Sequence, residues 1–212
     1  MKRGLLIILS GPSGVGKGTV REQLFKEESL NLAYSISMTT RYQRPGEKEG
    51  IDYFFVDVDT FKKKIEQGEL LEYAQFVGNY YGTPKAYVDQ LLDEGKNVVL
   101  EIEVQGAMHI KEQYPDAVLI FLTAPNAATL QQRLEGRGTE EKKVIAKRLK
   151  RAYEETDDMP QYDYLVVNDD LDTCVDDVHA VIRAESFKTQ KHNDYINNMK
   201  EELNAIRKEI LS

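Results

Sequence analysis

The sequence has 212 residues, of which 41% are hydrophobic and 30% charged, a profile typical of a globular protein with a sizeable core. Its formal net charge of −8 argues against binding nucleic acid through a broad basic surface. No stretch approaches the roughly 20 apolar residues that a membrane span needs. The single cysteine, Cys174, cannot form a disulfide within the chain, so composition favours a reducing, cytoplasmic setting.

Apolar runs and helical patterns alternate along the chain. Short runs rich in Val, Ile and Leu predict buried parallel strands at residues 5–9, 97–103, 117–123 and 164–168. Helices are predicted after the glycine loop at 11–19, over 84–95 with Thr83 as N-cap, after 103–106 and over 126–136. This βαβ alternation predicts an α/β fold, an open parallel sheet with helices on both faces.

The segment GPSGVGKGT at residues 11–19 follows the first predicted strand and opens the first helix. Its glycines let backbone N–H groups surround an anion, and Lys17 adds positive charge for the β and γ phosphates. A plain glycine turn is the alternative, and the lysine argues against it. Gly18 stands where such loops usually carry the Ser or Thr that holds magnesium. We therefore expect Mg²⁺ to be held mainly by phosphates and water, with Thr19 as a helper at most.

Residues 32–82 interrupt the alternation. The runs LAYSIS, DYFFV, LLEYAQFV and YYG predict an inserted, mainly antiparallel module with a hairpin at VGNYYG. Within it, Arg41 and Arg44 offer planar donor forks for a second phosphate, although a solvated loop accounts for them equally well. The carboxylates of Glu72 and Glu103 suit the two donors on the edge of guanine. The alternative for each is an ordinary ion pair with a basic neighbour.

Two further segments carry charge or periodicity. Residues 135–151 are rich in both charges and are interpreted as a mobile lid on a helix pair, with a solvated helix as the alternative. From Asp176 onward the pattern predicts one long helix. Its apolar residues recur every three or four positions, and we expect this seam to pack against the protein's own core rather than a partner.

The motifs together resemble one family. GPSGVGKGT is followed by SISMTTRYQRPGEKEGIDYFF, EYAQFVGNYYGTP, LEIEVQG, RLEGRGTE and VVND. The pattern TTRxxRxGExxGxDYxF with GNYYGT is specific to guanylate kinases, and the sequence is similar to the bacterial type from about residue 4 to 184. Two departures are Gly18, where many members have Ser, and the glutamates at 101 and 103, where Asp is frequent.

The resemblance implies transfer of the γ-phosphate from ATP to GMP, with Mg²⁺ present, and these site residues. The GMP phosphate would be held by Ser37, Arg41, Arg44 and Tyr81, with Tyr53 beside them. Guanine would be read by Glu72, Thr83 and Glu103. ATP would contact the loop residues Gly11, Pro12, Ser13, Gly14, Val15, Gly16, Lys17, Gly18 and Thr19, with Arg133 and Asn168 near the adenine. Catalysis would depend on Lys17, Arg41 and two lid arginines, Arg137 and Arg148.

The resemblance also implies a division of the chain. A guanylate kinase-like domain would cover 4–184, with its core at 4–33, 84–125 and 156–184, a GMP-binding module at 34–83 and a lid at 126–155. Residues 185–212 would form a helical extension, and a homodimer is an open possibility. Two other functions are weighed: a non-catalytic module of the scaffold type, against which Lys17 and the lid arginines argue, and a kinase for AMP or a nucleoside, against which the acceptor carboxylates argue.

Overall fold

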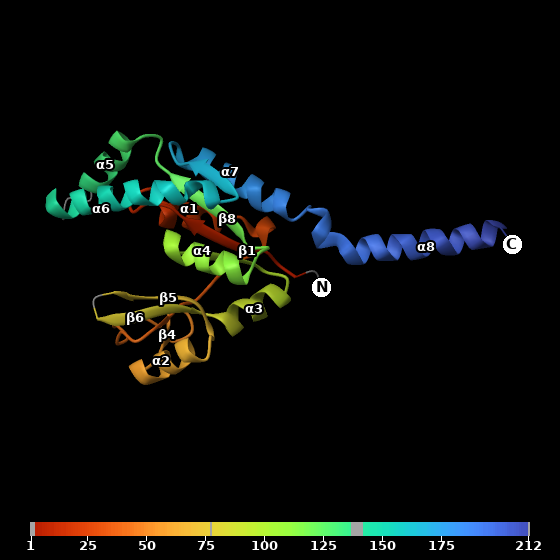
Figure 1. Ribbon diagram of the computed structural model, residues 1–212, viewed down its shortest axis with the longest axis horizontal. Coiled ribbons are helices and arrows are strands. Elements are labelled where there is room, and N and C mark those ends of the chain that lie inside the picture. Colours follow the sequence, from red (N-terminus) through yellow and green to blue (C-terminus); the bar gives the residue numbers. More distant parts are fainter. Residues whose placement is uncertain (1–2, 77, 137–141, 212) are drawn as a thin grey trace.

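The structure, a computed structural model, describes residues 3–76, 78–136 and 142–211. Its core is a five-stranded parallel sheet, and the predicted α/β fold is confirmed (Figure 1). In spatial order the strands are β2 (Leu32–Tyr34), β7 (Asn97–Glu101), β1 (Leu6–Ser10), β8 (Val118–Thr123) and β9 (Tyr164–Val167). The four apolar runs that predicted parallel strands correspond to β1, β7, β8 and β9, which are all the strands of this sheet except β2.

Helices cover both faces of this sheet. Along β1 the side chains alternate: Ile7 and Leu9 enter one apolar cluster, whereas Leu6 and Ile8 enter another. The first cluster is completed by α1 (Lys17–Leu24), α5 (Ala127–Glu135), α6 (Lys142–Glu155) and α7 (Leu171–Glu185). The second is completed by α3 (Lys85–Asp93) and α4 (Val104–Gln113). Short 3₁₀ turns lie at η1 (Glu28–Leu30) and η2 (Thr156–Gln161).

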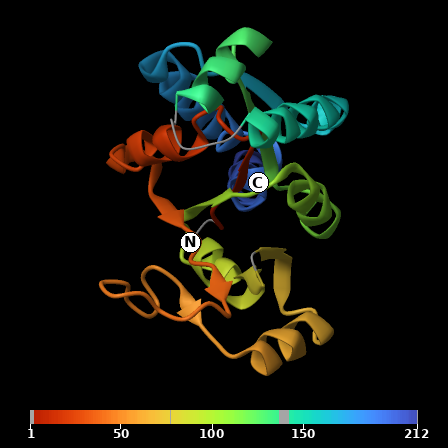
Figure 2. The ribbon, with the colours of Figure 1, turned by 90° about the vertical axis from the view of Figure 1, so that its left-hand side faces the viewer.

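A second, four-stranded sheet forms a separate layer below the core (Figure 2). Its order is β4 (Phe54–Phe55), β3 (Met38–Thr39), β6 (Asn79–Pro84) and β5 (Leu70–Phe76). The β5–β6 pair is the predicted antiparallel hairpin. Helix α2 (Val58–Glu66) closes the layer by burying Phe61 completely, and the Asp57 side chain caps it by accepting from the Thr60 N–H.

One strand lies in a different sheet from the one expected. The run LAYSIS was assigned above to the inserted module, and this is wrong for its first three residues, since β2 pairs in parallel with β7 of the core. Asn97 explains the attachment. Its amide nitrogen donates to the Leu30 carbonyl at 2.8 Å while its amide oxygen accepts from the Leu5 N–H at 2.9 Å. One side chain thereby holds the segments that lead into β2 and β1 on either side of β7.

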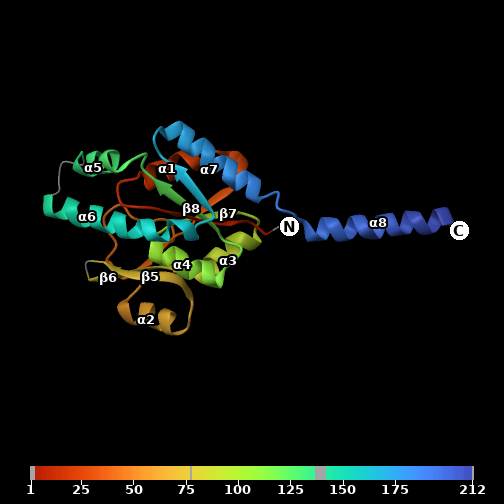
Figure 3. The ribbon, with the colours of Figure 1, turned by 45° about the horizontal axis from the view of Figure 1, so that its top comes forward.

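The C-terminal segment also differs from its prediction. Helix α7 ends at Glu185, a 3₁₀ turn η3 (Thr189–His192) follows, and α8 (Asn193–Leu211) projects away from the body (Figures 1 and 3). The expected single helix is therefore two, and its seam does not pack on the protein's own core. Four seam residues of α8 are exposed: Met199, Leu203, Ile206 and Ile210.

Candidate active site

The phosphate-binding loop joins β1 to α1. Gly11, Gly14 and Gly16 have φ of 143°, 95° and 93°, a region that side chains with a Cβ rarely adopt. A Cβ on Gly11 would also lie 2.1 Å from the Leu122 carbonyl oxygen, so only glycine fits there. These glycines direct the loop into the first turn of α1, where free N–H groups and the helix dipole favour an anion.

Lys17 is the first residue of α1 and folds over the loop. Its Nζ donates to the Gly11 carbonyl at 2.6 Å and to the Pro12 carbonyl at 3.3 Å. Burial lowers the pKa of Lys17, and the nearby carboxylates of Glu103 and Glu101 oppose that shift. Phosphate oxygens placed here would favour the charged ammonium strongly, because the site is partly desolvated.

The cavity over this loop has a volume of about 380 Å³. It is lined by Ser13, Gly14, Gly16, Lys17, Gly18, Thr19, Glu22, Glu101 and Glu103. Cations and backbone N–H groups suit nucleotide phosphates, and the acidic oxygens beside them suit Mg²⁺, which prefers oxygen ligands and keeps several waters. The donor set present therefore fits a magnesium–nucleotide complex.

Gly18 leaves room for a small side chain. A Cβ there would lie 3.9 Å from the two carboxylate oxygens of Glu101, which is an ordinary contact distance. Glu101 itself is held by Arg21, whose Nη1 donates to its Oε2 at 2.9 Å. The absent hydroxyl is thus not excluded by crowding, and the position is free to accept one.

We expect Gly18→Ser to be tolerated and Gly16→Ala to be harmful. Serine is a better helix residue than glycine by about 0.5 kcal/mol, and its hydroxyl would give Mg²⁺ a direct ligand. Alanine at position 16 would combine a φ of 93° with a Cβ 2.6 Å from the Asn168 Nδ2, at a cost of about 1–3 kcal/mol. Thermal unfolding measures both changes, and an Mg²⁺ titration of the rate should show Gly18→Ser saturating at lower Mg²⁺. A loss of stability in Gly18→Ser would contradict the room for a small side chain at Gly18.

Asn168, expected near the adenine, lies against the loop backbone. It is 6% exposed, and its Nδ2 donates to the Val15 carbonyl at 2.7 Å. Its own N–H donates to the Thr123 carbonyl at 2.8 Å, so it ties the phosphate loop to the end of β8. This contact gives Asn168 a role in loop shape, while contact with an adenine stays a prediction.

On the second sheet, Arg41 is positioned by an acidic neighbour. Its guanidinium donates to Glu47 at 2.7 Å and to the Tyr42 carbonyl at 2.8 Å, and it lies 5.3 Å from the centre of the Tyr53 ring. Glu47 also accepts from the Arg44 N–H at 2.8 Å, and its bond with Arg41 lowers the pKa of the Glu47 carboxyl. The carboxylate thus shapes the loop that carries both arginines.

The other predicted phosphate ligands lie on neighbouring strands. The Tyr81 ring packs edge-on against Tyr53, with centres 6.1 Å apart. Ser37 directly precedes β3, and its carbonyl accepts from the Phe54 N–H at 2.9 Å. The structure therefore gathers Arg41, Tyr53 and Tyr81 in one place, whereas no side-chain contact is described for Ser37.

The predicted guanine-reading residues flank the start of α4. The Thr83 hydroxyl donates to Glu72 Oε1 at 2.6 Å, which couples the last residues of β6 to β5. Thr83 is not the N-cap of α3 as predicted; Pro84 takes that position. A Cβ on Gly106 would lie 3.7 Å from the Cβ and Cγ of Glu72, so the stem of this side chain packs against the first turn of the helix that follows Glu103. Burial raises the pKa of Glu72, with the Thr83 bond opposing the shift.

The lid arginines have distinct neighbours. From α6, Arg148 Nη1 donates to the Ser13 hydroxyl of the phosphate loop at 3.1 Å. From α5, Arg133 Nη2 reaches the Asp169 carbonyl at 3.5 Å, beside Asn168. Arg137 lies outside the described residues. Helix α6, part of the predicted lid, therefore already reaches the phosphate loop.

The sequence as a whole matches one family model. The match covers residues 3–185 and is described as guanylate kinase. The chain belongs to the guanylate kinase family.

Curated relatives of this guanylate kinase family agree in length as well as in sequence. A guanylate kinase of Streptococcus thermophilus is 53% identical over 198 residues, which is 93% of this chain and 95% of the relative. One of Streptococcus pneumoniae is 56% identical over 185 residues, covering 87% and 89%. The crystal structure of guanylate kinase from Anaplasma phagocytophilum aligns with a TM-score of 0.67 at 34% identity, over 89% of each chain.

Several residues at this guanylate kinase-type site were not found by sequence reasoning. Glu47 belongs to the quoted motif but was given no role. The pairing of Glu101 with Arg21 bridges 80 positions and has no local signal. Arg151, which contacts Glu103, could have been found from its spacing, because it lies three residues after Arg148 on the same helix face.

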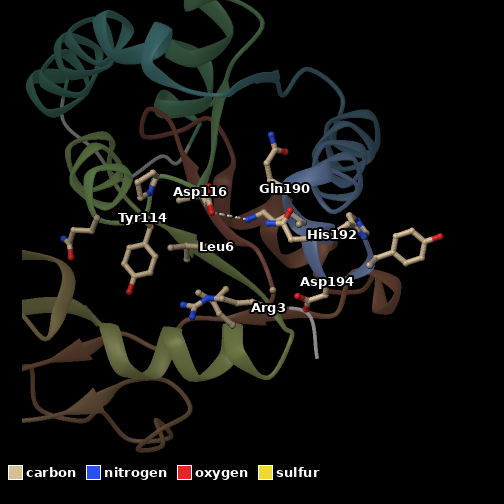
Figure 4. Close-up of a pocket in the computed structure, with 15 residues that line it drawn as sticks. Arg3, Leu6, Tyr114, Asp116, Gln190, His192 and Asp194 are labelled. Carbon is tan, nitrogen blue, oxygen red and sulfur yellow. Dashed lines mark ion pairs between the residues drawn. The ribbon is translucent and has the colours of Figure 1, made fainter. Parts of the chain in front are cut away.

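A larger cavity of about 830 Å³ lies elsewhere, at the base of α8 (Figure 4). Arg3, Tyr114, Asp116 and His192 line it, and Lys191 reaches Asp116 at 3.8 Å. Its walls include Leu6 and Ala117, at the amino ends of β1 and β8. Ligands of open α/β sheets bind at the opposite, carboxyl ends, where the phosphate loop lies. The smaller cavity is therefore the candidate site.

Among the described residues, no helix combines the length and apolar character needed to span a bilayer. Cys174 is fully buried, and burial raises the pKa of its thiol to about 11. A buried thiol with a raised pKa is a poor nucleophile, so Cys174 contributes to packing rather than to chemistry.

Proposed function

We propose that the protein is an ATP:GMP phosphotransferase that produces ADP and GDP reversibly. The observation that carries this proposal is the pairing of two sites: a lysine-bearing phosphate loop on the core, and a Glu72–Thr83 pair on the second sheet facing α4. Membership of the guanylate kinase family supports ATP as the donor and GMP as the acceptor. The same site also suits dGMP, which shares the base and phosphate.

The proposed roles follow the chemistry of each side chain. Lys17 and the loop N–H groups bind the ATP phosphates, and Arg148 approaches them from the lid, joined by Arg137. Arg41 and Arg44 bind the GMP phosphate together with Ser37, Tyr53 and Tyr81. Glu72 and Glu103 accept from the N1–H and amino group of guanine, whereas adenine offers an acceptor at N1 and is rejected. Arg133 and Asn168 lie beside the adenine.

The transfer needs no general base. The second pKa of a phosphate monoester is about 6, so GMP is a dianion at neutral pH. One of its oxygens forms a bond to the γ phosphorus while the bond to the ADP oxygen breaks, and the electron pair leaves with ADP. Catalysis then consists of alignment and neutralisation of charge by Lys17 and the arginines. Lid closure excludes water and limits hydrolysis of ATP.

Magnesium would be held mainly by phosphates and water, and the carboxylate of Glu101, which lines the cavity over the loop, would supply a further oxygen. When bound it neutralises charge on the β and γ phosphates. Thr19, which is exposed, is placed only to assist.

We propose that the core of the enzyme consists of residues 4–33, 84–125 and 156–184. The GMP-binding module is 34–83, the lid 126–155 and the helical extension 185–212. We also propose a cytoplasmic role in recycling guanine nucleotides.

A coupled assay of ADP formation with GMP, dGMP, AMP, CMP and UMP tests the function. We expect GMP to be used best, dGMP next and AMP hardly at all. Equal use of AMP would overturn the guanine assignment. Nucleotide binding without ADP formation would favour a non-catalytic module.

We further propose that the protein is a homodimer. The exposed apolar residues of α8 support this, because such a seam is usually covered in solution. Sedimentation at several concentrations should give twice the monomer mass, and Leu203→Glu with Ile206→Glu should shift it to monomer. A monomer at all concentrations would refute the proposal.

A further inference from the structure

Arg151 is the one arginine on the lid helix for which a described ion pair reaches an acceptor-site residue. Its Nη2 lies 2.9 Å from Glu103 Oε2, and its Nε lies 3.0 Å from Glu155 Oε1. Two different nitrogens of one planar fork therefore hold two carboxylates at once. Because a guanidinium is planar and fixed in shape, this arrangement restricts the direction of the Glu103 carboxylate, although the Glu103 side chain is 60% exposed.

The second carboxylate anchors the fork. The Glu155 side chain is 9% exposed, and no hydrogen-bond partner of its Oε2 is described. Burial raises the pKa of Glu155, so its negative charge is stabilised here chiefly by Arg151 and Lys17. Loss of Arg151 would remove an ion-pair partner from this largely buried carboxylate, which disfavours the ionised acid.

The helix that carries Arg151 also contacts the donor site. Arg148, one turn earlier, reaches Ser13 of the phosphate loop, while Arg151 reaches Glu103. The two arginines share a face of α6 because they are three residues apart. Movement of α6 toward bound ATP therefore moves both contacts together.

We propose that Arg151 is a positioning residue that orients Glu103 toward guanine and couples the lid helix to the acceptor site. The 2.9 Å contact of Arg151 is with Oε2 of Glu103, and the proposal assigns Oε1 as the oxygen that accepts from a guanine donor. Occupancy of the donor site, by fixing α6, then prepares Glu103 for GMP. This inference rests on the proposed function, because it takes Glu103 as a reader of guanine.

Binding of GMP should be measured by calorimetry with and without a non-hydrolysable ATP analogue. The variants are Arg151→Ala, Arg151→Lys and, as a matched control, Lys150→Ala. Lys150 lies on the same helix, carries the same charge and pairs only with the exposed Glu154 among described contacts. The wild type should bind GMP more tightly when the analogue is present.

Arg151→Ala should raise the Kd and KM for GMP about threefold to tenfold, leave the KM for ATP within about twofold, and remove the gain from the analogue. Arg151→Lys offers one nitrogen in place of two and should fall between. Lys150→Ala should match the wild type. Circular dichroism melts check that each variant folds.

Three outcomes would overturn the proposal. If Arg151→Ala tightens GMP, the ion pair blocks Glu103 instead of orienting it. If Arg151→Ala and Lys150→Ala behave alike, or if the wild type shows no gain from the analogue, Arg151 couples nothing. Failure of the proposed function would look different, since the wild type would then not phosphorylate GMP at all.

Discussion

Replacing Lys17 with methionine should lower kcat by about a hundredfold to a thousandfold. The ammonium is the fixed positive charge closest to the loop backbone, bonded to Gly11 and Pro12, and it neutralises charge that grows on the transferred phosphoryl group. Methionine keeps the length and the unbranched shape of the side chain. The rate measured at saturating ATP, GMP and Mg²⁺ tests this expectation.

The stability of the same variant separates function from folding. Burial lowers the pKa of Lys17, so the folded state disfavours the charge that the unfolded chain carries at neutral pH. Removing the charge should leave the free energy of unfolding unchanged or higher. Lys85→Met, on α3, controls for the loss of one positive charge. Near-normal turnover in Lys17→Met would remove the phosphate loop from the mechanism.

Glu72→Gln should raise the KM for GMP about tenfold to a hundredfold and change the KM for ATP little. The NH2 group of the glutamine amide would face one of the two hydrogen-bond donors of guanine, and the charged acceptor would be lost. Thr83 can still donate to the remaining carbonyl oxygen, so the local fold should persist. Initial rates over a range of GMP concentrations give the result.

The pH dependence of GMP binding gives a second test of Glu72. Only the ionised carboxylate accepts both guanine donors, and burial raises its pKa above the ordinary 4.5. Its contribution is therefore complete above the raised pKa and is lost as pH falls through it. The GMP phosphate also titrates near 6, in both proteins. The difference between wild type and Glu72→Gln isolates the carboxylate.

The thermal stability of Glu72→Gln is the control for its effect on GMP binding. A carboxyl whose folded pKa is raised destabilises the fold at neutral pH, because the unfolded chain ionises it more readily. Glu72→Gln should therefore unfold at the same temperature or a higher one. A large fall in melting temperature would mean that Glu72 holds the structure rather than the base.

Local patterns predicted much of the fold. The phosphate loop lies where GPSGVGKGT predicts it because φ-positive glycines and a following helix are local properties. The strands of the core were visible as apolar runs since both faces of a parallel sheet are buried. Residues 32–34 (LAY) were not predicted to be a core strand. Strand β2 is only half-buried, and its place in the core depends on Asn97, which is remote in sequence.

In the candidate site too, local motifs predicted some features and contacts between distant segments decided the others. Motif letters pointed to Arg41, Glu72 and Lys17 because each residue type suits its ligand whatever surrounds it. The motifs could not predict which charged side chains form ion pairs with one another. Arg21 with Glu101 and Arg151 with Glu103 are pairs between distant segments, brought together only by packing.

The sequence by itself determined the family, the phosphate loop and the chemistry of the two substrates, since these depend on residue types at short spacing. Only the tertiary structure decided that Asn168 braces the loop, that α8 leaves the body, and that the lid helix contacts both sites. Such contacts depend on the relative positions of whole elements, which are set by burial summed over the entire core.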